Sequence, residues 1–243
     1  MQERLHMKIH PGTNPEPFTT TIADIDELFI LLSESHCYPR GGGQPGDRGA
    51  FVHGGVSSTF GEALGGEYIR HPVKFPDEFS IGEEVECRID KDVRNRHAKM
   101  HTTQHIVSAM ADDLWGAETA GNQISTHYTR IDLLFENRDE YDSKTLEEEV
   151  NAIIGSNTDV LVHDWTRERI LGHEQMRHTK FMHRIPSSIP TLRVVEVQGV
   201  DLCPCAGTHV SNTRDVDSIV ITGVKSKGAG KFRITYQFEN ELQ

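Results

Sequence analysis

The stretch "DVRNRHAKMHTTQHIVSAMADDLWG", residues 92–116, marks a change in the character of the chain. Its apolar residues, Ile106 and Met110 among them, recur at roughly helical spacing, which predicts an amphipathic helix. Asp92 is a plausible N-cap, and Gly116 is suited to end the helix. We therefore expect one helix here and different architectures on its two sides.

Upstream of this helix the pattern is that of β-strands. "FTTTIAD" and "EEVECRID" alternate polar and apolar residues, and "LFILL" is a short apolar run. Ten glycines fall within residues 41–66. Short strands joined by glycine turns predict a small β-barrel-like domain over residues 18–90. Residues 1–17 carry three prolines and one glycine and are expected to be a loose polar N-terminal tail or an edge segment.

Downstream of the helix, helical and strand patterns are mixed. "SKTLEEEVNAIIGSN" predicts a second helix, and "TRERILGHEQM" predicts a short one. Strands are expected at "STHYTRIDLLFE", "DVLVHDW", "TLRVVEVQGV", "DSIVITGVKS" and "KFRITYQFE". The predicted fold class is therefore α+β, with the small β domain followed by a larger α+β domain over residues 91–243.

Composition limits the possible settings and partners. No apolar run approaches 18 residues, so no membrane partner is expected. Four cysteines in 243 residues do not make a disulfide framework, which favours a reducing, cytoplasmic location. The formal net charge of −12 argues against a nucleic acid as partner, because phosphate contacts need Lys and Arg.

Basic residues are nevertheless concentrated in three short segments. Residues 91–99 and 225–233 hold four Lys or Arg each, and residues 177–184 hold three together with two His. These segments could form one electropositive face that contacts nucleic acid, or they could be ordinary solvated surface.

Two local pairs of residues have the spacing of metal ligands. "HTTQH" places His101 and His105 four residues apart, and therefore on one face of the predicted helix. "CAGTH" places Cys205 and His209 in a loop between predicted strands. A thiolate and imidazoles in a tetrahedral arrangement suit zinc best, so we predict one Zn²⁺ ion held by both pairs. Each pair alone would be weak evidence.

Other interpretations of these residues were compared with the zinc site. Cys203 could replace Cys205 as the ligand, or it could be a small buried thiol before a proline turn. A zincin protease needs Glu after the first His, where this chain has Thr102. A nucleobase deaminase needs H-x-E and P-C-x-x-C, and neither is present at this site.

"HTTQHIV" followed by "CAGTHV" resembles the paired zinc motifs of the alanyl-tRNA synthetase editing domain and of its free-standing relatives, the AlaX-type alanyl-tRNA editing proteins. "YPRGGGQPGDRG" (residues 38–49) and "RVVEVQGVDLCPCAGTHVSNTRDV" (residues 193–216) resemble the same family. The resemblance implies a zinc-dependent hydrolase with tRNA as its partner. It would cleave the ester that joins serine, or secondarily glycine, to alanine tRNA. No nucleotide cofactor is expected, because the glycine-rich segment lacks the Lys-Ser/Thr of a P-loop.

Residues near the proposed ligands are candidates for further roles. Gln104 and Thr103 are candidates for catalysis, with Gln104 placed to position water or a ribose hydroxyl. Asp201 could accept a hydrogen bond from a ligating histidine, or merely form a turn. The candidates for substrate binding are Thr102, Asn122, Gln123, Ser125, Asp201 and Thr208 and, by resemblance, Gly42, Gly43 and Gln44. The candidates for tRNA backbone contacts are Arg94, Arg96, Lys99, Lys225, Lys227, Lys231 and Arg233.

Several alternatives stay open at this level. Four protein ligands make a closed tetrahedral site, so the zinc could act in catalysis or chiefly hold the pocket. The substrate could instead be another small mischarged aminoacyl-tRNA, such as serine on threonine tRNA. The chain could also be a non-catalytic, zinc-stapled RNA-binding module.

Overall fold

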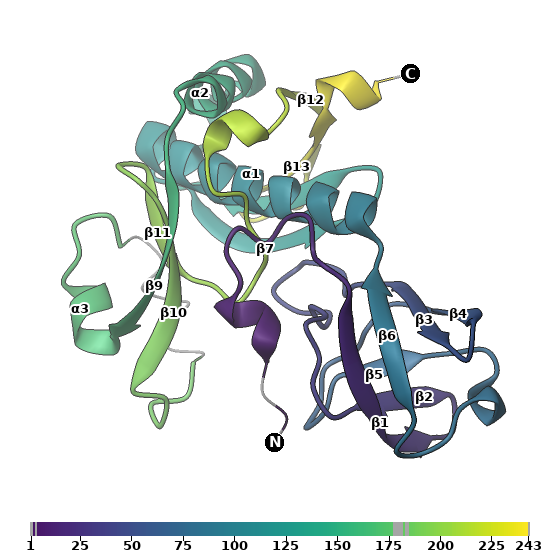
Figure 1. Cartoon of the computed structure of the whole chain (residues 1–243). Coiled ribbons are helices and arrows are strands. Elements are labelled where there is room, and N and C mark those ends of the chain that lie inside the picture. Colours follow the sequence, from purple (N-terminus) through teal and green to yellow (C-terminus); the bar gives the residue numbers. More distant parts are fainter. Residues whose placement is uncertain (1, 3, 177–181, 183–184, 243) are drawn as a thin grey trace.

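The computed structural model describes residue 2, residues 4–176, residue 182 and residues 185–242. Within these residues the fold is mixed α+β, as the sequence predicted, with antiparallel sheets around one long helix (Figure 1). The helices are α1 (Lys91–Trp115), α2 (Ser143–Gly155) and α3 (Arg167–Leu171). The strands are β1 (Phe18–Asp26), β2 (Phe29–Leu32), β3 (Gly49–His53), β4 (Val56–Phe60), β5 (Arg70–Pro72), β6 (Glu84–Ile89), β7 (Glu118–Ile124), β8 (Thr129–Leu134), β9 (Val160–Thr166), β10 (Thr191–Val197), β11 (Asp201–Pro204), β12 (Ile219–Ser226) and β13 (Lys231–Phe238). Short 3-10 helices are η1 (Leu5–Lys8), η2 (Pro76–Glu78), η3 (Arg138–Glu140), η4 (Thr213–Asp215) and η5 (Glu239–Glu241).

The first sheet has six strands in the order β4-β3-β6-β1-β2-β5. Its apolar core includes Phe51 and Phe60, whose rings stack with their centroids 4.7 Å apart. An isolated antiparallel bridge joins Phe60, at one edge of the sheet, to Val73, beside the other edge. Among the described residues no continuous ladder closes the sheet. The Gly61 N–H also donates to the Pro72 carbonyl, and Leu64 forms a second isolated bridge with Arg70. The structure therefore shows a sheet whose edges are joined by isolated bridges, rather than a closed barrel.

Helix α1 starts after Asp90, whose carboxylate accepts a hydrogen bond from the Val93 backbone N–H at 3.1 Å. The N-cap is thus Asp90 and not the predicted Asp92, because only the former reaches a free amide of the first turn. Gly116 ends the helix in the left-handed conformation (φ 61°), as predicted.

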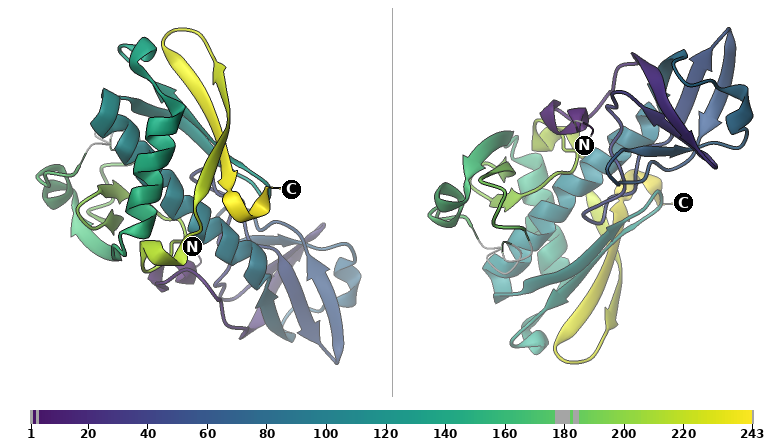
Figure 2. Two further views of the ribbon diagram at one scale, coloured as in Figure 1. Left: turned by 90° about the horizontal axis from the view of Figure 1, so that it is seen from above. Right: turned by 90° about the horizontal axis from the view of Figure 1, so that it is seen from below.

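The position of α1 buries much of its surface. It contacts β7 and β8 of one sheet, β10 and β11 of another, and α2. Figure 2 shows this helix passing between the other elements of the C-terminal half. Polar side chains on α1 are consequently enclosed by protein, and they need partners within it.

The remaining strands form two smaller sheets. Strands β12-β13-β8-β7 make a four-stranded sheet, with α2 packed against β12. Strands β11-β10-β9 make a three-stranded sheet, with α3 beside β9. Strand β7 was not expected, because its sequence "ETAGNQI" lacks the apolar alternation of a half-buried strand. Cys203 lies in β11, and the segment with Cys205 and His209 follows this strand.

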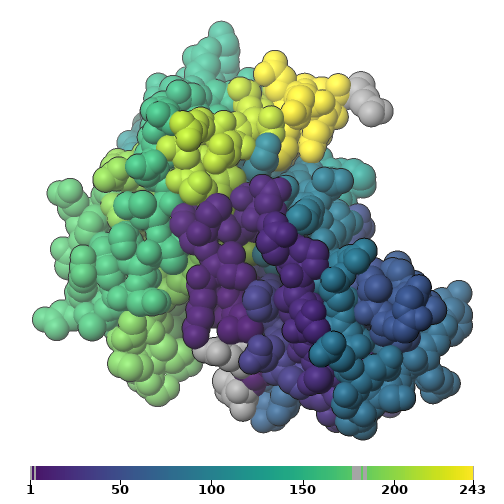
Figure 3. All heavy atoms as spheres, in the orientation of Figure 1, coloured from purple at the N-terminus to yellow at the C-terminus, as the bar shows by residue number. Residues whose placement is uncertain are grey.

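The residues before β1 are packed rather than loose. The Gln2 side chain donates to the Leu32 carbonyl at 2.6 Å and accepts from the Ile69 N–H at 2.8 Å. The Gly12 N–H donates to the His209 carbonyl at 2.7 Å. Figure 3 shows this N-terminal segment lying between the first sheet and the C-terminal half of the chain. These backbone and amide hydrogen bonds leave no sign in the sequence, which explains the expectation of a tail.

No helix among the described residues is long and apolar enough to cross a membrane.

Candidate metal centre and adjoining cavity

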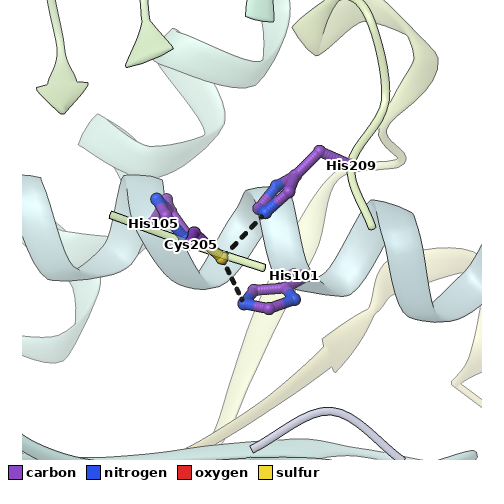
Figure 4. A group of neighbouring side chains, drawn as sticks. All are labelled: His101, His105, Cys205 and His209. Carbon is purple, nitrogen blue, oxygen red and sulfur yellow. Dashed lines mark hydrogen bonds between the residues drawn. The ribbon is translucent and has the colours of Figure 1, made fainter. Parts of the chain in front are cut away.

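Three imidazoles and one thiol converge where α1 meets the segment after β11 (Figure 4). His101 and His105 project from one face of α1, and Cys205 and His209 come from the loop. One ligand-type atom from each of the four residues lies within 4.8 Å of all the others. The Cys205 Sγ lies 3.6 Å from Nε2 of His101 and 3.4 Å from Nε2 of His209.

The opposite nitrogen of each ring, Nδ1, is held by a hydrogen-bond partner. Nδ1 of His101 lies 2.7 Å from Oε1 of Gln44, and Nδ1 of His105 lies 2.9 Å from Oδ2 of Asp201. Nδ1 of His209 lies 3.1 Å from the Thr102 hydroxyl. Partners of this kind orient the rings of metal-binding histidines in other proteins.

These partners also assign the ring tautomers. Oε1 of Gln44 accepts from the Thr208 backbone N–H at 3.1 Å, so it is the carbonyl oxygen of the amide. The Thr102 hydroxyl donates to the Ala98 carbonyl at 3.1 Å, so it can only accept from the imidazole. Both facing Nδ1 atoms therefore donate, and the carboxylate of Asp201 requires the same of His105. Each Nε2 is then the nitrogen that would give its lone pair to a cation, and for His105 this requires the loss of a proton from Nε2.

The charge state of the thiol matches this arrangement. Burial favours the neutral thiol, but the imidazoles of His101 and His209 lower the pKa of Cys205 well below its ordinary value. The Gly207 backbone N–H donates to Sγ at 3.3 Å and further supports a thiolate. Burial also opposes protonation of His105, but the hydrogen bond to Asp201 and the sulfur outweigh it and raise its pKa to about 10.

The loop approaches α1 so closely that a side chain would not fit at its centre. A Cβ atom on Gly207 would lie 2.1 Å from Cε1 of His101, far inside van der Waals contact. The spacing "CAGTH" therefore needs glycine at this position so that the backbone can bring Cys205 and His209 onto the helix. The residues present could hold a metal ion.

A cavity of about 510 Å³ opens beside the cluster. Its walls come from the N-terminal segment, the glycine-rich loop after β2, helix α1, strand β7 and the segment after β11. One wall is a chain of polar groups: Asn122 donates to Gln104 at 2.9 Å, and Gln104 donates to Ser108 at 2.8 Å. Thr119 also donates to Ser108 at 2.8 Å. The cavity thus places oriented hydrogen-bonding groups near the candidate metal ligands.

Comparisons with known proteins define the family. A family model described as "Threonyl and Alanyl tRNA synthetase second additional domain" matches residues 192–235. An alanyl-tRNA editing protein AlaX-M from Saccharolobus solfataricus is 32% identical over 242 residues, which cover 97% of this chain and 98% of that protein. This chain belongs to the AlaX-type alanyl-tRNA editing proteins.

Other family members are similar over most of the chain. An AlaX-M protein from Methanosarcina mazei is 29% identical over 90% of both chains. An AlaX-L protein from Pyrococcus horikoshii is 32% identical over 87% of this chain, which corresponds to 51% of that longer protein.

In this AlaX-type chain the residues named from the sequence for substrate binding fall into three places. Asn122, Gly42 and Gly43 line the cavity beside the ligands, as does Gln104, the candidate named for catalysis. Gln44, Thr102 and Asp201 lie behind the ligands as their hydrogen-bond partners, and Thr208 holds Gln44 in place. Gln123 and Ser125 line a second cavity on the other side of the glycine-rich loop.

Thr103 lies away from the cavity. Its hydroxyl donates to the Lys99 carbonyl of the same helix at 2.9 Å, and the side chain is fully buried. Among the described residues that line the cavity beside the ligands, Thr103 does not occur. The helix turn that brings His101 and His105 to the cavity directs Thr103 elsewhere, so the geometry gives no support to a catalytic role for it.

The basic residues named from the sequence differ in their availability. Arg94 is only 2% exposed and donates to both carboxylate oxygens of Asp47, so the expectation of a tRNA contact there is wrong. Its ion pair with Asp47 instead joins α1 to the glycine-rich loop inside the protein.

Three further basic side chains on the surface are already paired with carboxylates. These pairs are Arg96 with Glu241, Lys99 with Asp217 and Arg233 with Asp132. Lys225 and Lys227 are exposed and Lys231 is half-buried near the tip of the β12–β13 hairpin. Nearly all of the third basic segment, residues 177–184, lies outside the described residues.

Several cavity residues were missed at the sequence level. Ser108 lies four residues after Gln104, so the helical period could have placed both on one face. Arg4, His6 and Tyr38 also line the cavity, but no local pattern indicates that they do. Arg4 and His6 reach it because the N-terminal segment folds back against the loop after β11, and Tyr38 reaches it from the glycine-rich loop after β2.

Proposed function

We propose that this chain is a zinc-dependent hydrolase that removes a wrong amino acid from alanine tRNA. Water would cleave the ester and release the free amino acid and a tRNA with an intact 3′ end. Serine is the first substrate proposed, and glycine is the second. The observation that carries the proposal is the convergence of His101, His105, Cys205 and His209 at the edge of a cavity of about 510 Å³.

Zinc is the cation that best fits this donor set. Tetrahedral bonds of about 2.0–2.1 Å to nitrogen and about 2.3 Å to sulfur imply a sulfur–nitrogen separation of about 3.6 Å. The separations of Cys205 Sγ from Nε2 of His101 and of His209, 3.6 Å and 3.4 Å, agree with this value. Bound zinc would supply positive charge at the end of the cavity that carries the ester.

The chain's own groups would orient the substrate. Gln104 uses its carbonyl oxygen to accept from Asn122 and its amide nitrogen to donate to Ser108. This network fixes the Asn122 amide, whose hydrogen bonds to the described residues are both made through its nitrogen, Nδ2. In this proposal the amide's carbonyl oxygen would accept a hydrogen bond from the serine hydroxyl, and a site of this kind would favour serine over an amino acid without the hydroxyl.

The proposal of tRNA as partner rests on the family and on basic groups at the surface. Arg40 lines the cavity with its side chain 63% exposed, and Arg4 lines it from the N-terminal segment. Lys225 and Lys227 offer further positive charge on the β12–β13 hairpin. Contacts from such residues to phosphates would offset the net charge of −12 locally.

The decisive experiment offers the purified protein four charged tRNAs and follows loss of the ester. The substrates are alanine tRNA charged with serine, glycine or alanine, and threonine tRNA charged with serine. We expect rapid loss of serine from alanine tRNA, slower loss of glycine, and little loss of alanine. Treatment with a strong chelator should abolish hydrolysis, and added zinc should restore it.

Three outcomes would contradict parts of the proposal. Preference for serine on threonine tRNA would make the chain an editor of a different tRNA. Tight binding of alanine tRNA without any hydrolysis would make it a non-catalytic RNA-binding module. Full activity after proven removal of the metal would exclude a role for zinc.

A further inference from the structure

The glycine-rich loop separates two cavities. The second cavity has a volume of about 610 Å³ and shares residues 40–43 of the loop with the first. Gly41, Gly42 and Gly43 carry no side chains, so the ridge between the cavities is low. Position 43 must remain glycine, since a Cβ atom there would lie 2.2 Å from Oδ1 of Asn122. A strand of nucleotides leaving the first cavity can therefore cross this ridge into the second.

An unpaired imidazole lines the second cavity. His97 is 1% exposed, and neither ring nitrogen has a hydrogen-bond partner among the described residues. Buried polar groups in native proteins are nearly always paired, so an unpaired imidazole beside a cavity points to a ligand. His97 lies one helical turn before His101, so the same face of α1 serves both cavities.

The other groups at this cavity suit a nucleotide better than a bare anion. Burial, against a smaller opposing effect of Asp47, lowers the pKa of His97 to about 4, so a neutral ring offers one donor and one acceptor. Glu62 pairs with Arg40 and offsets its charge. Arg48 donates to Asp90 at 3.2 Å through Nε alone, and its side chain is 53% exposed. Its terminal nitrogens are thus available for a phosphate at the rim.

We propose that the second cavity binds the RNA nucleotide that precedes the esterified terminal adenosine, with His97 contacting its base or ribose and Arg48 its phosphate. This inference rests on the proposed function, because it requires the 3′ end of a tRNA in the first cavity. The volume lies within the range of about 300–1,000 Å³ that is usual for ligand pockets. The nucleotide would act as an anchor that holds the ester beside the metal ligands.

The test compares two esters that differ only in the upstream nucleotides. One is alanine tRNA charged with serine, and the other is seryl-adenosine, which cannot reach the second cavity. For His97→Phe we expect the ratio of the two kcat/KM values to fall about tenfold, as for loss of one buried hydrogen bond. For Arg48→Gln the ratio should fall about threefold. The control is Arg88→Gln, which removes a similarly exposed arginine (58%) outside both cavities and should leave the ratio unchanged.

An equal loss on both esters, or no loss in either variant, would overturn the inference while leaving the proposed function intact. Hydrolysis of neither ester by the unmodified protein would instead reject the proposed function. In that case a direct binding measurement still tests the proposed nucleotide site. The trinucleotide CCA should bind at least tenfold more tightly than adenosine, and His97→Phe should remove that advantage. Equal binding of CCA and adenosine, or binding of free cytidine monophosphate as tight as that of CCA, would refute an RNA subsite.

Discussion

Each imidazole of the candidate metal centre is oriented by a different kind of acceptor. An amide oxygen holds His101, a carboxylate holds His105 and a hydroxyl holds His209. Of these three acceptors only the carboxylate of Asp201 is charged, and its side chain is fully buried. Hydrogen bonds to a charged acceptor are roughly twice as strong as those between neutral groups. Asp201 is therefore the partner whose loss should affect the metal site most.

Replacing that carboxylate should weaken metal binding without removing a ligand. We expect Asp201→Asn to lower the affinity for Zn²⁺ by about 10–100-fold, the usual effect of losing such a partner. Competition with a chromophoric chelator measures the affinity directly. Asp217→Asn is the control, since Asp217 pairs with Lys99 at the surface. Unchanged zinc affinity in Asp201→Asn would show that the carboxylate does not support His105.

At this scale the sequence was informative about the ligands and about one of their partners, because Asp201 was a candidate acceptor for a ligating histidine and is the acceptor for His105. It did not identify Gln44 or Thr102 as partners. His101 with His105, and Cys205 with His209, are recognised because each pair is local and has a regular spacing. Gln44 is the acceptor for His101 from 57 residues away, and such a distant contact leaves no local pattern. By resemblance Gln44 was expected to bind substrate, as part of the glycine-rich segment, and not to orient a ligand.

Among the elements, α1 shows how the helical repeat directs neighbouring side chains to different partners. Thr102 points toward the loop, where its hydroxyl meets His209 and the Val210 backbone N–H. Thr103 is the next residue and bonds only within the helix. The two threonines form a natural pair for comparison, because both are buried and they differ mainly in their partners.

Replacing each threonine with valine should separate these roles. Thr102→Val leaves the Val210 N–H without its acceptor, so we expect a loss of about 1–3 kcal/mol in the free energy of unfolding. Thr103→Val removes a second bond to a carbonyl of the helix, so a smaller loss of about 0.5–1 kcal/mol is expected, with hydrolysis retained. Urea denaturation of both variants measures the difference. Equal losses, or inactive Thr103→Val protein with native stability, would contradict this assignment.

Elements with strong periodicity were predicted well from the sequence. Helix α2 carries Leu146, Val150 and Ile154 on one stripe, and the structure buries all three. Strand β7 was missed, because hydrogen bonds to β8 and contacts with α1 stabilise it rather than its own composition. The predicted N-cap of α1, Asp92, lies two residues after the observed one, Asp90. Both aspartates are suitable N-cap residues, and the sequence alone does not distinguish between them.

Across the whole molecule the proposed RNA contacts depend on which basic side chains are exposed and are not already paired with a carboxylate. Lys225 and Lys227 lie on the β12–β13 hairpin, and both are exposed. Lys225→Gln and Lys227→Gln should each weaken tRNA binding and reduce the salt slope of log K by about one. Fluorescence titrations at several salt concentrations measure this slope. Lys144→Gln, on α2 with its side chain 80% exposed, is the control. A slope identical in all three variants would exclude the hairpin from the interface.

How distant segments of the chain pack against one another was the feature least predictable from the sequence. Of the three apolar clusters, one lies in the first sheet and two lie in the part of the chain after it, in agreement with the β and α+β patterns of the sequence. The packing of the N-terminal segment against the segment after β11 could not be foreseen, because it depends on backbone groups such as the Gly12 N–H. Arg94 was misjudged for a related reason: a basic residue looks the same in sequence whether it is buried against Asp47 or exposed.

The hydrogen bond between Gly12 and His209 has a consequence for how the protein is made. A ribosome adds residues in order, so His101 is synthesised 104 residues before Cys205. Until then a nascent chain has half of the donor set, and the N-terminal segment lacks the surface on which it comes to rest. Loading of the proposed metal ion would therefore be a late event in biogenesis, and the metal content of a preparation would report how many molecules completed their folding.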